Sequence, residues 1–250
     1  MQIKEISMNT SSRFRDNNAA GDADDSRILV WDAPVRLFHW LFAACLAGAW
    51  LTAESEHWRL VHVTLGYTAG GLVIFRLGWG LIGTKYARFS SFVRGPARAW
   101  QYVLDLLRGR PQRHVGHNPA GAVVIVAMLA LACVLTITGW ATYNDAGGTW
   151  LGEVHEGVAN LMLALVGVHI AGVVVSSWLH RENLIGAMVS GHKSGQPDEG
   201  VRHAWRSVAA LMLLAVLAFW WWQWHGASML PCSDMMSLPG IKGCPNDSGD

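Results

Sequence analysis

Four histidines lie in apolar stretches of the chain, and their residue type and position suggest metal ligation. His39 and His62 lie in the first and second of these stretches, and His155 and His169 lie in the fourth. A histidine in hydrocarbon is costly and rare, so it is a functional candidate by default. One such histidine is explained equally well by a hydrogen bond between helices, but four together favour a cofactor with imidazole ligands. The other seven histidines lie in loops or at span edges.

The spacing of His155 and His169 predicts two separate sites on one helix. Fourteen residues separate them, which is about 21 Å along a helix axis and leaves the two side chains only about 40° apart around it. Both side chains therefore face the same way at opposite depths of a membrane. Depth pairs His155 with His62 near the outer surface. It pairs His169 with His39 near the inner surface, and this second match is the looser one.

Two histidines from facing helices at each site are the ligand set that holds a b-type haem. Competing metal sites fit less well. Catalytic zinc commonly uses His-Glu-x-x-His, and residues 155–156 supply only half of this motif because residue 159 is alanine. A di-iron bundle needs carboxylates inside the spans, which the span interiors lack. The histidines therefore predict two haems b.

Arginines near the same levels are candidates to hold haem propionates. Arg76 follows His62 by fourteen residues, so it lies on a similar helix face near the inner level. An arginine inside the membrane needs a partner, and a propionate offers charge-assisted hydrogen bonds. Extension of Arg76 to the inner headgroups is an equally good interpretation. Arg36 near the inner site and Arg59 near the outer site are further candidates.

Three glycines follow His62 in the second apolar stretch, at positions 66, 70 and 71. Their lack of a side chain either opens room for a porphyrin face or allows close packing between helices, and the spacing does not decide between these uses.

The elements that must position these residues are transmembrane helices. The chain has 250 residues, of which 52% are apolar and 15% are charged, whereas a soluble chain carries about 25% charged residues. A helix needs roughly 20 apolar residues to cross a bilayer. Five stretches approach that length, namely 36–54, 59–82, 121–142, 156–179 and 206–224. We predict an all-α membrane protein: a four-helix transmembrane haem-binding bundle plus a fifth transmembrane helix.

The distribution of Lys and Arg predicts the orientation of this bundle. These residues gather in the N-terminal segment and between spans two and three and spans four and five, whereas the opposite links are acidic. The positive-inside rule then predicts that the N-terminus lies in the cytoplasm and the C-terminus on the outer side of the membrane. The formal net charge of +1 averages over two unlike faces and gives no indication of nucleic-acid binding.

The composition divides the chain into four parts. We expect a disordered cytoplasmic tail over 1–27, a four-span core over 28–193, a linker with the fifth span over 194–224, and a periplasmic tail over 225–250. Within the core, residues 84–119 combine aromatic and basic residues and predict an amphipathic segment on the inner surface.

Several motifs in this order resemble bacterial di-haem cytochromes b, the family of cytochrome b561 and of the cytochrome b subunits of nickel–iron hydrogenases. Residues 30–40 (VWDAPVRLFHW) resemble the start of the family's first span. Residues 116–119 (GHNP), residues 137–143 (ITGWATY) and the surroundings of His155 and His169 continue the likeness. The resemblance covers roughly residues 28–193.

This resemblance implies two haems b, with His39 and His169 on the inner iron and His62 and His155 on the outer iron. It implies electron transfer between membrane quinone and a periplasmic redox partner, such as a c-type cytochrome or a hydrogenase. Quinone chemistry in relatives occurs beside the segment that enters the third span, near residues 117–118 here. Asn118 is also well placed to cap the third helix before Pro119.

Other functions are compatible with the same residues. The chain is either an electron-transfer subunit with possible quinone oxidoreductase activity or a stand-alone oxidoreductase of the superoxide:quinone type. A non-redox membrane anchor or ion-binding protein is a third possibility, and oligomerisation is possible in each case.

The chain after about residue 195 departs from the family's four-span core. The fifth span and the tail either dock a partner or complete the bundle. The four cysteines contain no Cys-x-x-Cys spacing, which excludes a thioredoxin motif, a zinc ribbon and covalently attached c-type haem. Cys232 and Cys244 are able to form a disulfide in an oxidising periplasm, whereas Cys45 and Cys133 serve as small apolar residues.

Overall fold

The computed structural model describes residues 26–93, 95–108 and 115–226. Five helices in this part of the chain are long and apolar enough to cross a membrane: α2 (Ala33–Thr52), α3 (Arg59–Ile82), α6 (Pro119–Tyr143), α7 (Trp150–His180) and α9 (Arg206–Gly226). The predicted fold class, a helical membrane bundle, is confirmed. Helix α7 begins six residues before the predicted fourth span, so His155 lies well inside it.

Short elements connect the long helices. They are β1 (Ser26–Leu29), η1 (Glu56–Trp58), α4 (Phe89–Phe92), α5 (Pro96–Leu107), α8 (Leu184–Ser190), β2 (His192–Gly195) and η2 (Pro197–Glu199). The predicted tails lie largely outside the described residues, as do Cys232 and Cys244.

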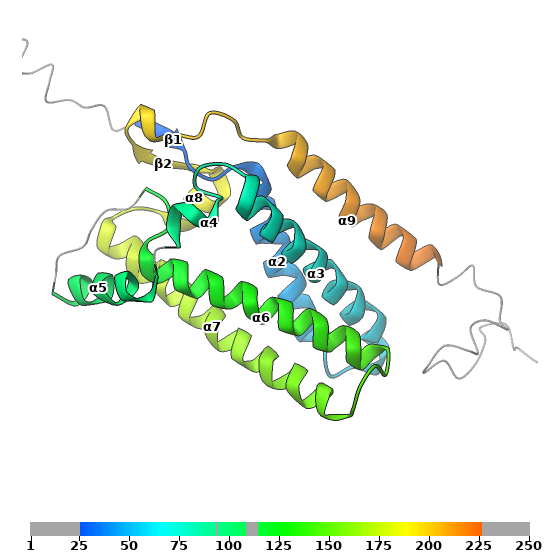
Figure 1. Cartoon of the computed structure of the whole chain (residues 1–250). Helices are drawn as coiled ribbons and strands as arrows, with labels where there is room; N and C mark the ends of the chain where they lie inside the picture. Colours follow the sequence, from blue (N-terminus) through cyan, green and yellow to red (C-terminus); the bar gives the residue numbers. More distant parts are fainter. Residues whose placement is uncertain (1–25, 94, 109–114, 227–250) are drawn as a thin grey trace, which may run out of the picture.

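The four helices of the core form two packed pairs, α2 with α3 and α6 with α7, which meet where α3 packs against α6 (Figure 1). Helix α9 runs along α2 and α3 on the side away from α7 (Figure 1). The Trp220 indole Nε1 of α9 donates a hydrogen bond to Thr68 Oγ1 of α3 at 2.8 Å. The fifth helix therefore packs on the bundle without entering its centre.

Local sequence signals determine where two of these helices begin. The Asp32 side chain accepts a hydrogen bond from the Val35 backbone N–H at 2.9 Å, and Pro34 occupies the first turn of α2. Asn118 Oδ1 accepts one from Gly121 N–H at 2.7 Å, with Pro119 as the first residue of α6. Side-chain caps satisfy backbone donors that lack partners at a helix start, and proline has no such donor there.

An apolar core lies between the helices. Its buried members are Phe38, Phe42, Cys45, Leu72, Val73, Leu129, Ala132, Met162 and Met212. Met162 is fully buried and lies seven residues from both His155 and His169. Since seven residues are about two helical turns, α7 turns one face towards the bundle along its length, and the two histidines are on this face.

A small folded cap closes one end of the bundle. Strands β1 and β2 pair antiparallel, with Ser26 opposite Gly195 and Leu29 opposite His192. A second buried apolar cluster lies beneath them and consists of Ile28, Val30, Trp31, Val35, Trp79, Ala87 and Ala187. The hydropathy pattern does not predict this sheet, whose first strand begins within the range expected to be a tail.

Helix α5 lies against α6 at the same end. Ala99 and Tyr102 are buried, whereas Trp100 is 65% exposed. The helix falls within residues 84–119, for which the composition predicts an amphipathic surface segment.

Candidate functional site

The four intramembrane histidines lie together as two pairs at different levels of the bundle. The ring centroids of His39 in α2 and His169 in α7 are 6.3 Å apart, with an interplanar angle of 52°. Those of His62 in α3 and His155 in α7 are also 6.3 Å apart, with an angle of 72°. These are the partners that helix depth predicts, and we call them the inner pair and the outer pair after their predicted sides.

The separation within each pair fits one metal ion between two imidazoles. A histidine nitrogen binds a metal at about 2.0–2.1 Å and lies about 1.2 Å from its own ring centre, so two coaxial ligands place their centroids roughly 6.4–6.6 Å apart. The 6.3 Å separation in both pairs is close to this spacing. No group of three or more His, Cys, Asp or Glu residues able to hold a metal occurs in the described chain. The donor set is therefore two imidazoles per site, as for a bis-histidine haem.

Hydrogen bonds orient both rings of the outer pair. His62 Nδ1 lies 2.8 Å from the carbonyl oxygen of Ala49, in the last turn of α2, where carbonyls lack intrahelical N–H partners. His155 Nδ1 lies 3.1 Å from Thr138 Oγ1 of α6. In the tautomer that these contacts favour, each Nδ1 carries the proton and each Nε2 is left as the metal-binding nitrogen.

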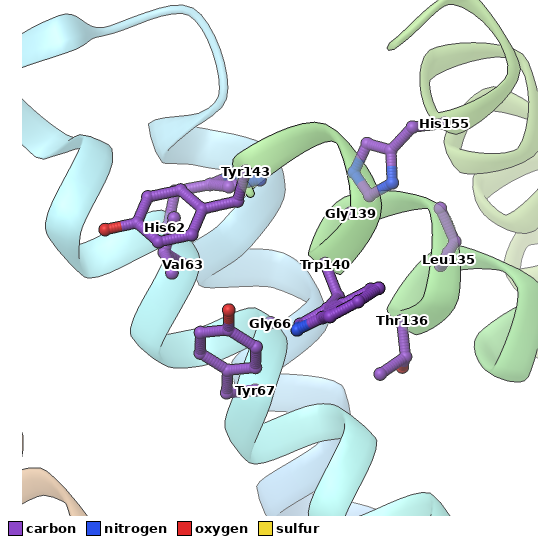
Figure 2. A pocket seen from close by; sticks show the side chains of 10 residues that line it. All are labelled: His62, Val63, Gly66, Tyr67, Leu135, Thr136, Gly139, Trp140, Tyr143 and His155. Carbon is purple, nitrogen blue, oxygen red and sulfur yellow. The ribbon is translucent and has the colours of Figure 1, made fainter. Parts of the chain in front are cut away.

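A pocket lies between the two rings of the outer pair. Figure 2 shows His62, Gly66 and Tyr67 on one helix facing Trp140, Tyr143 and residues near His155 on the other side. The pocket contains about 360 Å³ of space without atoms, part of it open to the surroundings.

The three glycines after His62 have different neighbours. A Cβ atom at Gly66 or Gly71 would meet nothing within 4 Å, and Gly66 lines the outer pocket. At Gly70 it would lie 2.5 Å from Thr136 Cγ2 of α6. Gly66 thus leaves open space beside the histidine pair, whereas Gly70 permits the close approach of α3 to α6.

The inner pair has a different environment. His39 Nδ1 is buried and has no hydrogen-bond partner among the described residues. Arg76 is 3% exposed, and its guanidinium carbon lies 4.8 Å from the centroid of the Phe89 ring. One of its terminal nitrogens is buried and has no hydrogen-bond partner among the described residues. This guanidinium does not extend to the surface, which disfavours the snorkelling interpretation. A buried cation with a free donor is suited to bind an anionic group.

The other two arginine candidates lie in less enclosed places. Arg36 donates a hydrogen bond to the Val189 carbonyl oxygen at 2.7 Å, while its Nε is buried without a partner in the described chain. The side chain of Arg59 is 51% exposed, and its guanidinium lies 3.8 Å from Glu56. Arg36 resembles Arg76 in having an unused buried donor, whereas Arg59 lies at the rim of the bundle.

Residues 117–118 have distinct surroundings. Asn118 caps α6, as the sequence suggests. The His117 ring lies between Trp31 and Phe92, with centroid distances of 4.5 and 4.7 Å, and its Nδ1 is buried without a hydrogen-bond partner in the described residues. Burial, and to a lesser extent the positive charge of Arg76, lower the pKa of His117 to about 3. His117 is therefore neutral near pH 7.

The structure also brings together polar residues that the sequence does not single out. Asp32 is fully buried and accepts hydrogen bonds from Trp79 Nε1 at 3.0 Å and from Thr84 Oγ1 at 2.7 Å. Lys193 and Glu182 form a 3.0 Å ion pair beneath the cap, with the lysine side chain 4% exposed. An aspartate in an otherwise apolar run is the signal that identifies Asp32, whereas the ion pair has no comparable sequence signal.

The chain is similar to known prokaryotic membrane cytochromes. Residues 30–191 match the family described as prokaryotic cytochrome b561. The chain is 22% identical over 218 residues to a probable Ni/Fe-hydrogenase B-type cytochrome subunit of Rhodobacter capsulatus, covering 68% of this chain and 83% of the relative. It is 25% identical to the protein of the same description from Azotobacter vinelandii, covering 68% and 91%.

A probable Ni/Fe-hydrogenase 1 B-type cytochrome subunit of Escherichia coli K12 is 26% identical over 142 residues, which cover 46% of this chain and 60% of that relative. No solved structure matches the chain significantly.

Proposed function

Since the chain belongs to the prokaryotic cytochrome b561 family, it is a multi-pass bacterial membrane protein of electron transfer with b-type haem, and we propose that it holds two such haems. The observation that carries this proposal is the presence of two histidine pairs with the same 6.3 Å ring separation. His39 and His169 would hold the inner haem, and His62 and His155 the outer one. Bound haem supplies one-electron chemistry at its iron.

The region between the two histidine pairs is apolar and closely packed, which suits electron transfer without the passage of water. Met162 lies midway between His155 and His169 on α7 and is fully buried, and Cys45 of α2 belongs to the same apolar core. The two histidines of α7 are about 21 Å apart along the helix axis. A close-packed apolar core excludes water and ions from this interval, so we expect electrons to pass while protons are retained.

Buried donors support the assignment of propionate partners. Arg76 is the strongest candidate at the inner haem because its guanidinium is enclosed and has an unpartnered nitrogen in the described chain. Arg36, with its buried Nε, is the second. Arg59 is the candidate at the outer haem, where its exposure predicts a weaker contribution than that of Arg76.

We place quinone exchange at the inner end, near residues 117–118. His117 supports this site because its Nδ1 is buried without a partner in the described residues and two aromatic rings flank its imidazole. A neutral imidazole N–H in that position is able to donate a hydrogen bond to a quinone carbonyl. The amide nitrogen of Asn118 remains available as a second donor, because its Oδ1 forms the helix cap.

The names of the relatives indicate the class of redox partner. They describe cytochrome subunits of Ni/Fe-hydrogenases, so we propose a hydrogenase as the partner at the outer haem. A c-type cytochrome is the alternative partner that the sequence resemblance implies. Positive residues then keep the N-terminus in the cytoplasm and the C-terminus in the periplasm of the inner membrane. In this arrangement the chain links a periplasmic protein to the quinone of a respiratory chain.

Haem content tests the ligand assignment. We expect the purified protein to show a b-type α-band in its reduced-minus-oxidised spectrum and to bind two haems per chain. His155→Ala should remove the outer haem and His169→Ala the inner one. His180→Ala is a matched control on the same helix, because its Nδ1 contacts the Ser176 carbonyl oxygen rather than a second histidine. Absence of the α-band, or two retained haems in either variant, would refute the proposal.

Reconstituted vesicles test transmembrane electron transfer itself. Vesicles loaded with ferricyanide and treated outside with dithionite should oxidise dithionite through the wild-type protein. The double variant His155→Ala and His169→Ala should fall to the rate of protein-free vesicles, whereas His180→Ala should retain the wild-type rate. Equal rates in the double variant and the wild type would contradict an electron path through the two haems.

A further inference from the structure

The two histidine pairs differ in what holds the ring nitrogen that faces away from the predicted iron. In the outer pair, His62 Nδ1 and His155 Nδ1 each lie within hydrogen-bond distance of a protein oxygen, at 2.8 and 3.1 Å. In the inner pair, His39 Nδ1 is buried and has no partner among the described residues. The outer ligands are therefore better anchored than His39.

Thr138 supplies a side-chain oxygen that anchors His155, next to the backbone carbonyl oxygen of Leu135, which also interacts with this histidine. The Thr138 hydroxyl lies 2.8 Å from the Val134 carbonyl oxygen and 3.3 Å from that of Leu135, and it donates its proton to these carbonyls of its own helix. The hydroxyl oxygen then has only lone pairs to offer, so it accepts the Nδ1 proton of His155 at 3.1 Å. Thr138 is 6% exposed, and water has little access to compete for this contact.

The next residue fixes the ring against the same helix. A Cβ atom at Gly139 would lie 2.9 Å from His155 Cε1 and 3.3 Å from its Nδ1. Figure 2 shows the His155 ring beside the α6 backbone at Gly139. Only glycine leaves room for an imidazole this close to the helix. Thr138 thus orients the His155 ring through a hydrogen bond, and Gly139 leaves the space that the ring occupies.

We propose that Thr138 is a positioning residue for the outer haem and that it lowers the midpoint potential of this haem. By accepting the Nδ1 proton of His155, it directs Nε2 at the iron and makes the imidazole a stronger electron donor. A stronger donor favours ferric over ferrous iron, and hydrogen bonding of an axial ligand is one means by which a protein sets a haem potential. The proposal rests on the proposed function, in which His155 is an axial ligand.

A bond from a threonine hydroxyl back to its own helix does not itself imply such a role, because it is common in membrane helices. Thr64 of α3 makes the same kind of bond to the Leu60 carbonyl oxygen at 2.7 Å. Thr64 is 4% exposed, it does not line the outer pocket, and no hydrogen bond joins it to a histidine in the described chain. It is therefore a control for Thr138, with the same residue type, similar burial and the same bond to its own helix.

A redox titration of three variants tests the proposal. Thr138→Val keeps the shape of the side chain and removes the oxygen, Thr138→Ser keeps the oxygen, and Thr64→Val removes a buried hydroxyl outside the outer pocket. We expect Thr138→Val to raise the ratio of ferrous to ferric outer haem at a fixed potential on the order of threefold to tenfold, where tenfold corresponds to about 59 mV. Thr138→Ser and Thr64→Val should titrate like the wild type.

His62→Ala identifies which component of the titration is the outer haem, because that component should be missing. Complete loss of the outer haem in Thr138→Val, with retention in Thr138→Ser, also supports a positioning role. A wild-type titration in Thr138→Val overturns the proposal, as does an equal shift in Thr64→Val or a shift of the inner component alone. Loss of the outer haem in both Thr138 variants overturns it as well. If the wild type binds no haem at His62 and His155, the proposed function fails first and separately.

Discussion

The buried carboxylate of Asp32 accepts a hydrogen bond from the indole Nε1 of Trp79 at 3.0 Å, which joins the start of α2 to the last turns of α3. The same carboxylate oxygen accepts from Thr84 Oγ1, and the other oxygen caps α2 through the Val35 N–H. His39 lies seven residues after Asp32, about two turns along the same helix. One carboxylate thus positions the helix that carries an inner ligand.

Asp32→Ala should strongly destabilise the inner end of the bundle. The substitution leaves three donors without their acceptor, and each buried unsatisfied donor costs about 1–3 kcal/mol. We expect a loss of roughly 3 kcal/mol or more in the free energy of unfolding, measured by denaturant titration in detergent. Asp198→Ala in the exposed turn η2 should change it by less than about 0.5 kcal/mol. Wild-type stability of Asp32→Ala would contradict the anchoring role.

The five membrane helices are predictable because bilayer thickness fixes the length of apolar sequence that each one needs. The errors occur where other forces act. Helix α7 extends back to Trp150 although its first turn includes the polar Glu153, because an acidic residue is favourable at a helix N-terminus. The sheet of β1 and β2 escapes prediction because each strand has four residues and pairs only across the folded chain.

The partners of the histidine pairs are also predictable, since helical phase and depth both follow from residue numbers. The groups that form hydrogen bonds to the histidine rings are not predictable from the sequence. The Ala49 carbonyl oxygen that contacts His62 belongs to a residue with no polar side chain. The contact between Thr138 and His155 depends on the rotation of α6 about its own axis relative to α7. Hydropathy does not reveal this rotation, because α6 is apolar on all sides.

Arg76→Gln should weaken the inner haem more than Arg59→Gln weakens the outer one. The guanidinium of Arg76 is enclosed and has a free donor in the described chain, whereas Arg59 is half exposed beside Glu56. A charge-assisted hydrogen bond contributes about 1.5–3 kcal/mol, or roughly 10- to 100-fold in affinity. Haem retained per chain after dilution or competition with apomyoglobin measures the difference. Equal retention in the two variants would contradict the predicted difference, and wild-type retention of the inner haem in Arg76→Gln would show that Arg76 holds no propionate.

Gly70→Ala should lower the stability of the protein and Gly66→Ala should not, although the two glycines lie about one turn apart. At Gly70 the new methyl group would lie 2.5 Å from Thr136 Cγ2, so we expect overpacking to cost about 1–3 kcal/mol. At Gly66 it would meet nothing within 4 Å, and stability should be unchanged. The larger Gly66→Leu substitution fills space beside His62 and should reduce the occupancy of the outer haem alone. Thermal unfolding and haem spectra of the same samples measure both effects.

His117 should make the fold sensitive to acid. Burial first, and then the charge of Arg76, lower its pKa from 6.5 to about 3 in the folded protein. Below pH 6.5 the unfolded chain takes up a proton that the folded protein does not, so the stabilising contribution is complete above pH 6.5 and is lost as the pH falls towards 3. The loss is about 1.4 kcal/mol per pH unit in this range.

The free energy of unfolding at pH 6.5 and 5.5 should therefore differ by about 1 kcal/mol less in His117→Gln than in the wild type. His203→Gln, a substitution at an exposed position, should keep the wild-type difference, and an unchanged difference in His117→Gln would contradict the burial of a neutral imidazole at this position.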